Sequence, residues 1–191
     1  VITARWRRDG RCVLEVGPSG IGKALMLKRL ETFNALPEKD ALAELLSVCT
    51  STVWAFAVLD QRPFKDQTAL LAASEVAWQL TGEADWLEAF EGHPKIGDAQ
   101  ALQGGAETTT MQEQGQVSMA LASTREALAR LNQLYLDRFG FIFIICASGR
   151  SAEAMRAVLE QSLERSRGDE LHRAAGEQRQ IMTRRLRAWF E

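Results

Sequence analysis

The fold class depends most on the stretch FGFIFIICA, residues 139–147. Its aromatic and β-branched side chains favour a β-strand. The sequence holds no second strand of similar quality to pair with it, and an isolated strand has no partner for its backbone. We therefore expect a buried extended segment, about Phe141–Ala147, that lies between helices in an all-α fold.

Helical spacing surrounds this segment. Before it, Leu121, Leu128, Leu131 and Tyr135 recur at intervals of seven, three and four residues, and Gly140 ends the pattern. The other helical patterns cover residues 37–49, 66–81, 83–90, 151–167 and 169–190. The sequence thus predicts a single compact multi-helix domain.

Composition excludes several classes of protein. The chain has 191 residues, of which 46% are hydrophobic and 25% charged, as in globular proteins. With 23 Lys and Arg against 25 Asp and Glu, it has no basic excess to neutralise phosphates, so we expect no nucleic-acid partner. No apolar run approaches the ~20 residues of a membrane span. Its 3 widely spaced cysteines indicate neither a disulfide framework nor a thiolate zinc site.

The first thirty residues differ from the rest. Val1–Val16 is an alternating stretch interrupted by Asp9-Gly10. The letters GPSGIGKA, residues 17–24, nearly match the phosphate-binding loop, but Ala24 replaces the hydroxyl that would hold Mg²⁺. We expect residues 1–30 to be an N-terminal extension of a domain at residues 31–191. Nucleotide binding by Gly17–Lys23 remains an alternative function.

His93 is the first candidate functional residue. Pro94 disfavours a helical conformation at His93, and Gly92 and Gly97 flank the pair, so the imidazole is expected in a loop between helices. The alternative is a histidine that caps a helix end. The other histidine, His172, lies in a charged helical stretch and is expected at the surface or in packing.

A second candidate is the set Thr110, Glu113 and Gln114. Thr110 and Glu113 have the spacing of a capping box, in which each satisfies the other's backbone donor. The three residues also share one helix face and are able to present a hydroxyl, a carboxylate and an amide to a polar ligand. Spacing alone does not choose between the two interpretations.

A third candidate is Arg185, in the last helical pattern. At 100° per residue it lies 40° from both Ile181 and Trp189, on an apolar arc, whereas Arg184 and Arg187 point away from this arc. An arginine on an apolar arc needs an anionic partner, which is either an internal carboxylate or a ligand.

Several motifs together resemble one known family, the 2-oxo-4-hydroxy-4-carboxy-5-ureidoimidazoline (OHCU) decarboxylases. The resemblance runs from about Phe33 to Phe190, and residues 139–150 are most similar to the decarboxylase half of plant-type allantoin synthases. The motifs that carry it are RPF at 62–64, DWLEAF at 85–90, HPKIGD at 93–98, TxxEQ at 110–114, NxxYxxxFGF at 132–141 and IxxxRL at 181–186.

The resemblance implies a carboxy-lyase of urate degradation that converts OHCU to (S)-allantoin and carbon dioxide without a metal or cofactor. It assigns His93 the role of catalytic acid or base, and Glu113 and Arg185 the roles of the other essential polar groups. The substrate-binding residues it implies are Pro94, Thr110, Gln114, Phe143, Ile144, Ile145, Cys146 and Ala147. The family usually has Ser where Thr110 stands, which keeps the hydroxyl.

The resemblance also implies partners and a compartment. The expected ligand is the small molecule OHCU, and the expected functional link is to a 5-hydroxyisourate hydrolase, to which plant-type members are fused. Family members are often dimers, so a homodimer is the implied assembly. A bacterial member would be cytoplasmic and a eukaryotic one peroxisomal, although residues 187–191, RAWFE, are not an S-K-L signal. A non-catalytic all-α interaction module is the remaining alternative.

Overall fold

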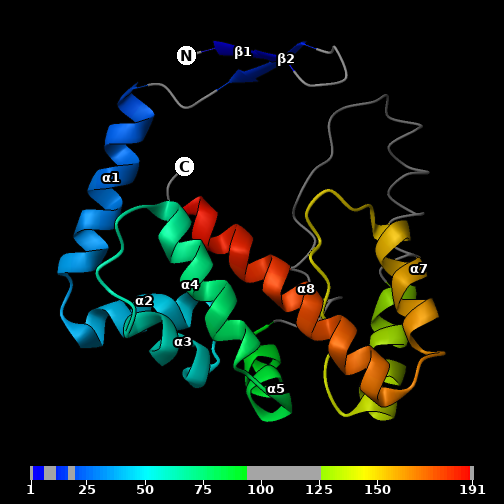
Figure 1. Cartoon of the computed structure of the whole chain (residues 1–191). Helices are drawn as coiled ribbons and strands as arrows, with labels where there is room; N and C mark the ends of the chain where they lie inside the picture. Colours follow the sequence, from blue (N-terminus) through cyan, green and yellow to red (C-terminus); the bar gives the residue numbers. More distant parts are fainter. Residues whose placement is uncertain (1, 7–11, 17–19, 94–125, 190–191) are drawn as a thin grey trace.

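The computed structural model describes residues 2–6, 12–16, 20–93 and 126–189 (Figure 1). Two strands, β1 (Ile2–Trp6) and β2 (Cys12–Val16), form an antiparallel hairpin that pairs Ile2 with Val16. The labelled helices are α1 (Gly20–Ala35), α2 (Glu38–Val48), α3 (Thr52–Leu59), α4 (Gln67–Gln79), α5 (Glu83–Glu91), α7 (Ala152–Ser162) and α8 (Arg167–Ala188). A further helix, yellow-green in Figure 1, covers residues 126–139.

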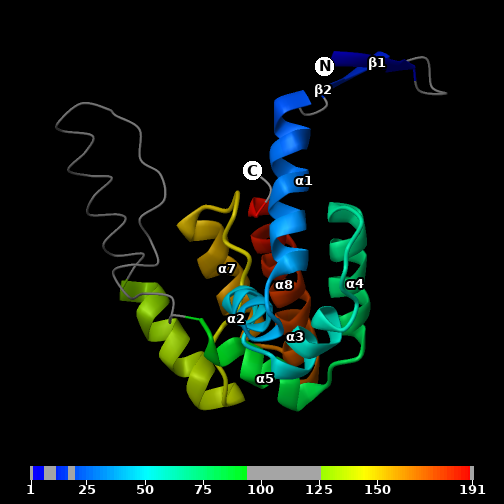
Figure 2. The ribbon, with the colours of Figure 1, turned by 90° about the vertical axis from the view of Figure 1, so that its left-hand side faces the viewer.

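The prediction of an all-α domain is confirmed. In the described part of the chain, strands occur only in the hairpin of residues 2–16, which lies at the N-terminal end of α1 and away from the packed helices (Figures 1 and 2). The alternating stretch of the sequence therefore pairs with itself and contributes no sheet to the core.

Helix α8 runs through the middle of the molecule and contacts α2, α4 and α5 (Figure 1). Its buried residues recur at helical spacing on a broad face and include Leu171, Ala175, Met182 and Leu186. The helix begins at Arg167, because the side chain of Ser166 accepts a hydrogen bond from the Asp169 N–H. The boundary predicted at 167–169 is therefore slightly wrong, and α7 ends earlier, at Ser162.

The predicted buried segment follows the helix of residues 126–139. Gly140 adopts a positive φ of 79° and ends that helix. Phe141 and residues 143–146 are buried, Ile142 is half-buried and Ala147 is exposed, so burial ends one residue earlier than predicted. The ring of Tyr135 packs at 5.6 Å from Phe141 and 5.3 Å from Phe143, which anchors the segment to the preceding helix.

Helix α3 was not predicted. Its eight residues, TVWAFAVL, are apolar on all sides except Thr52, so they show no helical period. The helix forms because Ser51 caps it by accepting a hydrogen bond from the Trp54 N–H. Its outer side chains, Val53 and Phe56, remain 45% and 47% exposed.

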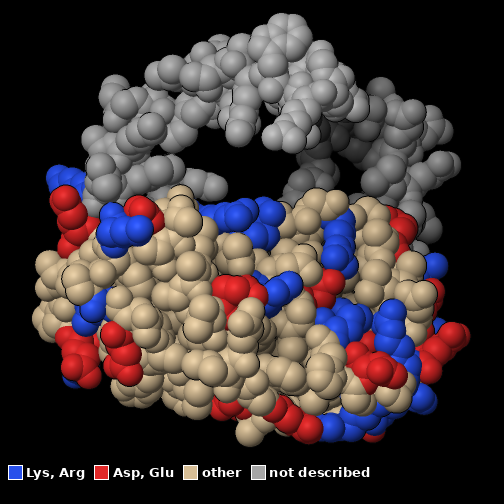
Figure 3. Space-filling view, in the orientation of Figure 1, with Lys and Arg blue, Asp and Glu red and all other residues tan. Residues whose placement is uncertain are grey.

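The surface carries charges of both signs. Figure 3 shows lysine and arginine interspersed with aspartate and glutamate over one face of the described residues. Among the helices of the described ranges, none combines the length and apolar character that a membrane span requires.

Candidate active site

His93 lies just beyond the end of α5. Its backbone N–H donates to the Phe90 carbonyl at 3.1 Å, and the residue is half-buried. The end of α5 is attached to the loop before α3, because the Thr50 hydroxyl donates to the Glu88 carbonyl at 2.8 Å and the Glu88 carboxylate accepts from the Thr52 N–H at 3.0 Å. These contacts fix the position from which His93 projects.

Gly92, the C-cap of α5, permits this close approach. A Cβ atom built at this position would lie 2.5 Å from Oγ1 and 2.6 Å from the methyl carbon of Thr50. No real Cβ makes such contacts without a shift of its neighbours. Glycine at residue 92 is therefore required by the space beside Thr50.

Arg185 reaches from α8 toward the C-terminal end of α2. Its Nη1 donates to the Val48 carbonyl at 2.6 Å, and the residue is half-buried. Arg184 and Arg187 are exposed, as the helical spacing predicts. The guanidinium has five N–H donors, so a single carbonyl engages only part of it.

Gln178 lies on the same face of α8, two turns before Arg185. It is fully buried, its Nε2 donates to the Cys49 sulfur at 3.5 Å, and its Oε1 has no hydrogen-bond partner among the described residues. Buried amide oxygens are nearly always paired. The Gln178 Oε1 is therefore available to accept a hydrogen bond from a neighbouring side chain or from a ligand.

The environment of His93 favours its neutral form. Burial lowers the pKa of this imidazole below its ordinary value of 6.5, and the positive charge of Arg185 lowers it further. The side chain of Gln178 acts in the opposite direction and favours the protonated ring. His93 follows α5, and Arg185 and Gln178 belong to α8. Arg185 binds Val48, Gln178 binds Cys49 and Gly92 lies against Thr50, so the three side chains share one site around residues 48–50.

Cys49, the C-cap of α2, borders the same site. Burial raises the pKa of its thiol, and the hydrogen bonds from Ser51 and Gln178 oppose this only in part. The thiol is therefore held in its neutral form, which is a poor nucleophile. Cys49 and Cys146 are both free and buried.

The segment of residues 143–147 lies along an adjacent face of α8. Arg173 Nη2 donates to the Ile144 carbonyl at 2.9 Å, and the Cys146 N–H donates to Glu177 Oε2 at 2.8 Å. Glu177 lies about 80° around α8 from Arg185, so the segment and the His93 site border neighbouring faces of one helix.

The predicted site is described in part. His93, Arg185 and residues 143–147 lie within the described ranges, whereas Pro94, Thr110, Glu113 and Gln114 lie outside them. Within the described ranges there is no group of three or more His, Cys, Asp and Glu side chains arranged to hold a metal ion. His172 makes the packing contacts expected of it, with the Gly168 carbonyl and the Trp86 ring.

Most of this chain is similar to known proteins. The family model described as OHCU decarboxylase matches residues 34–187. A protein of Arabidopsis thaliana named uric acid degradation bifunctional protein TTL is 34% identical over 145 residues, which is 74% of this chain and 45% of the plant protein. The chain thus spans less than half the length of that relative.

Two further relatives are similar over more of their own length. A 2-oxo-4-hydroxy-4-carboxy-5-ureidoimidazoline decarboxylase of Haloferax volcanii is 26% identical over 129 residues, which is 68% of this chain and 76% of that protein. A crystal structure of an OHCU decarboxylase in the presence of (S)-allantoin superposes with a TM-score of 0.65 and 34% identity, covering 77% of this chain and 96% of that one.

Proposed function

This chain belongs to the OHCU decarboxylase family, and we propose that it converts OHCU to (S)-allantoin and carbon dioxide. The observation that carries the proposal is the meeting of His93, Gln178 and Arg185 around residues 48–50, in one partly buried site inside the matched range. An interaction module would have no need for an unpaired buried amide oxygen beside a half-buried imidazole and a guanidinium.

The substrate supplies its own electron sink. When the bond between the ring carbon and the carboxylate breaks, the electron pair moves into the ring and the adjacent C=N group becomes C–N–H by taking up a proton. The resulting enol then loses its hydroxyl proton and gains a proton on the neighbouring carbon, which gives allantoin. The enzyme therefore needs to handle protons and to orient the substrate.

His93 is suited to the proton transfers. A neutral imidazole accepts a proton from the substrate hydroxyl and returns it to the ring, and burial together with Arg185 favours the neutral form. Which ring atom receives the proton from His93 is decided by substrate orientation, to which Glu113 contributes in the family assignment.

Arg185 and Gln178 are suited to bind the polar groups of the substrate. The donors of Arg185 that Val48 does not engage are suited to a carboxylate or carbonyl oxygen. The Gln178 Oε1 is suited to accept an N–H from the ureido group or from the imidazole of His93. The buried backbone of Phe143, Ile144, Ile145 and Cys146, with Ala147 and with Pro94, Thr110 and Gln114, completes the proposed substrate site.

The test is turnover of freshly generated OHCU in the presence of EDTA. Carbon dioxide release and the circular dichroism of the allantoin are followed with wild-type protein and with His93→Gln. We expect the wild type to form the S enantiomer, because the bound intermediate takes its proton from one face. In solution the planar intermediate takes a proton from either face and gives a racemate. Racemic allantoin formed at the same rate with both proteins would refute the proposal.

The assembly and pathway context are further parts of the proposal. The plant relative is named as a bifunctional protein of uric acid degradation. We propose that this chain receives its substrate from a 5-hydroxyisourate hydrolase and that it forms a homodimer. We further propose a cytoplasmic location if the source is bacterial and a peroxisomal one if it is eukaryotic.

A further inference from the structure

Two side chains of α8 hold the buried segment 143–147 at alternate residues. Arg173 donates to the Ile144 carbonyl at 2.9 Å, and Glu177, one turn later, accepts from the Cys146 N–H at 2.8 Å. Alternate residues of an extended chain present their backbone groups to the same side. The two side chains thus take the place of a neighbouring strand, and we call this pair the backbone clamp.

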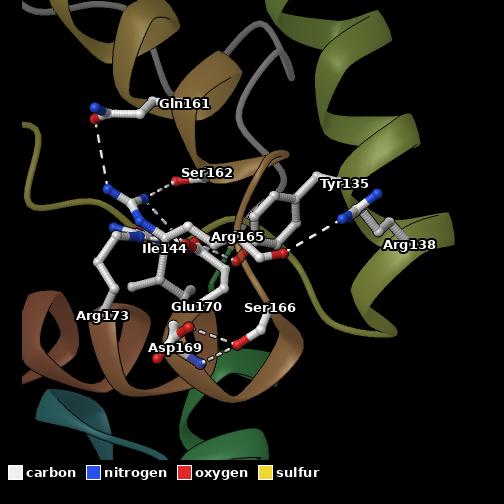
Figure 4. Close-up of polar contacts among 10 residues, drawn as sticks. All are labelled: Tyr135, Arg138, Ile144, Gln161, Ser162, Arg165, Ser166, Asp169, Glu170 and Arg173. Carbon is white, nitrogen blue, oxygen red and sulfur yellow. Dashed lines mark hydrogen bonds and ion pairs between the residues drawn. The ribbon is translucent and has the colours of Figure 1, made fainter.

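Both members of the clamp are held in place by other groups. Arg173 binds the fully buried Glu170, with Nε at 2.7 Å from Oε1 (Figure 4). Its guanidinium also stacks 4.8 Å from the centre of the Phe143 ring. Glu170 also accepts the Tyr135 hydroxyl at 2.7 Å and binds Arg165 at 3.2 Å (Figure 4).

Glu177, the second member, has a partner of its own. Its Oε1 pairs with Arg150 at 3.0 Å, while its Oε2 holds the Cys146 N–H. The side chain of Glu177 is 11% exposed, so neither of its contacts is a solvated surface pair. The clamp is therefore fixed on both sides before any substrate arrives.

Because backbone groups alternate along an extended chain, those of Ile145 point to the side opposite the clamp. Ile145 lies between the two clamped residues and is 6% exposed, and its backbone N–H and C=O make no hydrogen bond within the described residues. Buried backbone groups are rarely left unpaired. An adjacent donor and acceptor of this kind match the N–H and C=O edge of a cyclic urea or a ureido group.

We propose that Arg173 and Glu177 are positioning residues for the decarboxylation. They touch no substrate, and they set the register and direction in which the backbone of Ile145 meets it. This inference rests on the proposed function. It adds two residues that neither the helical spacing nor the family resemblance assigns.

The test compares variants that separate the backbone contact from the ion pair. Glu177→Ala removes both contacts, whereas Glu177→Gln keeps an oxygen that accepts the Cys146 N–H. Arg150→Gln is the matched control, because it breaks the same ion pair and leaves the backbone contact intact. For each variant we measure kcat and KM for OHCU and the unfolding midpoint in urea.

We expect Glu177→Ala to lower kcat/KM by about 10- to 100-fold, the cost of misplacing a binding group by about an ångström. Glu177→Gln and Arg150→Gln should stay within about threefold of wild type by the same reasoning. Equal losses in Glu177→Ala and Arg150→Gln would overturn the proposal. So would a shifted urea midpoint with unchanged kcat and KM in Glu177→Ala, since that result describes a purely structural role.

Arg173 is tested with a control that shares its partner. Arg173→Lys has an ammonium that does not span both Glu170 and Ile144, and kcat/KM should fall about tenfold. Arg165→Lys also alters a contact with Glu170 but touches no residue of the segment, and it should have little effect. An inactive wild type would refute the proposed function together with the clamp, whereas an active wild type with fully active Glu177→Ala and Arg173→Lys would refute the clamp alone.

Discussion

The positive charge of Arg185 lies close enough to His93 to lower the pKa of the imidazole. The arginine is held there because its Nη1 binds the Val48 carbonyl at 2.6 Å. Burial of His93 acts in the same direction and contributes more. The two residues thus form a site in which a neutral imidazole stands beside a fixed cation, an arrangement suited to a base that acts on an anionic substrate.

The first prediction concerns the titration of His93. Its pKa in the folded protein should lie below the ordinary 6.5, which proton NMR measures directly, because the chain has 2 histidines and His172→Gln assigns the other. Arg185→Gln should raise this pKa by removing a positive charge, and Gln178→Leu should lower it by removing an acceptor. A His93 pKa that is indifferent to both variants would contradict the shared site.

The same shift links pH to stability. Between the lowered native pKa and the unfolded value of about 6.5, the unfolded chain binds more protons than the native one, so the free energy of unfolding rises with pH. The contribution of His93 to the free energy of unfolding is fully present above about pH 6.5 and is lost as the pH falls toward the native pKa of His93. Urea unfolding of wild type and His93→Gln across this range measures the difference.

The second prediction concerns the catalytic role of His93. His93→Gln should lower kcat by a factor of about 10²–10⁴, the usual contribution of a positioned acid or base. Folding should survive, because the residue is half-buried at the end of α5 and does not fill the core. Circular dichroism checks the fold, and a near-normal kcat would remove the proton-transfer role.

The third prediction concerns Gly92. Gly92→Ala places a methyl group against Thr50, and the displacement of the end of α5 should cost about 1–3 kcal/mol of stability and lower kcat/KM. Thr50→Ala removes both atoms that the new methyl group meets most closely, so the double variant should recover part of the loss. Additive losses in the double variant would show that the space beside Thr50 is not the reason for glycine.

The sequence predicts those parts of the site that depend on periodicity. Arg185 was identified because it lies on an apolar arc of a regular helix, and the structure places it inward. Helical spacing does not single out Gln178, although it lies about 20° from Arg185 on the same arc, because an uncharged amide on an apolar arc needs no anionic partner.

Other features depend on contacts between residues that are distant in the sequence. The hydrogen bonds of Arg173 with Ile144 and of Cys146 with Glu177 join residues 29 and 31 positions apart. No local pattern encodes them, since either side chain is equally consistent with a solvated helix face. Helix α3 was missed for a different reason, namely that an element apolar on nearly all sides has no period to detect.

The fourth prediction concerns the N-terminal extension. A protein that begins at Lys28 retains the pairing of Arg29 with Glu44 at 2.6 Å, its stacking over Trp189 and the buried Leu30. It should remain folded and should turn over OHCU at the full-length rate, as thermal unfolding and kinetics will show. An insoluble product would mean that residues 1–27 belong to the domain. If the shortened protein and the full-length Lys23→Met variant both lost activity, the nucleotide-binding alternative would be favoured instead.

The last prediction separates Arg185 from its neighbour Arg184. Arg185→Lys should strongly lower turnover. The planar guanidinium binds Val48 and still has donors free for the substrate, and an ammonium does not reproduce this arrangement. Arg184→Lys exchanges one exposed cation for another and should change stability by at most a few tenths of a kcal/mol. Thermal unfolding accompanies the kinetics, because a collapsed fold in Arg185→Lys would indicate that the contact with Val48 serves structure. Equal and mild losses of turnover at both positions would show that Arg185 belongs to the solvated basic face of α8.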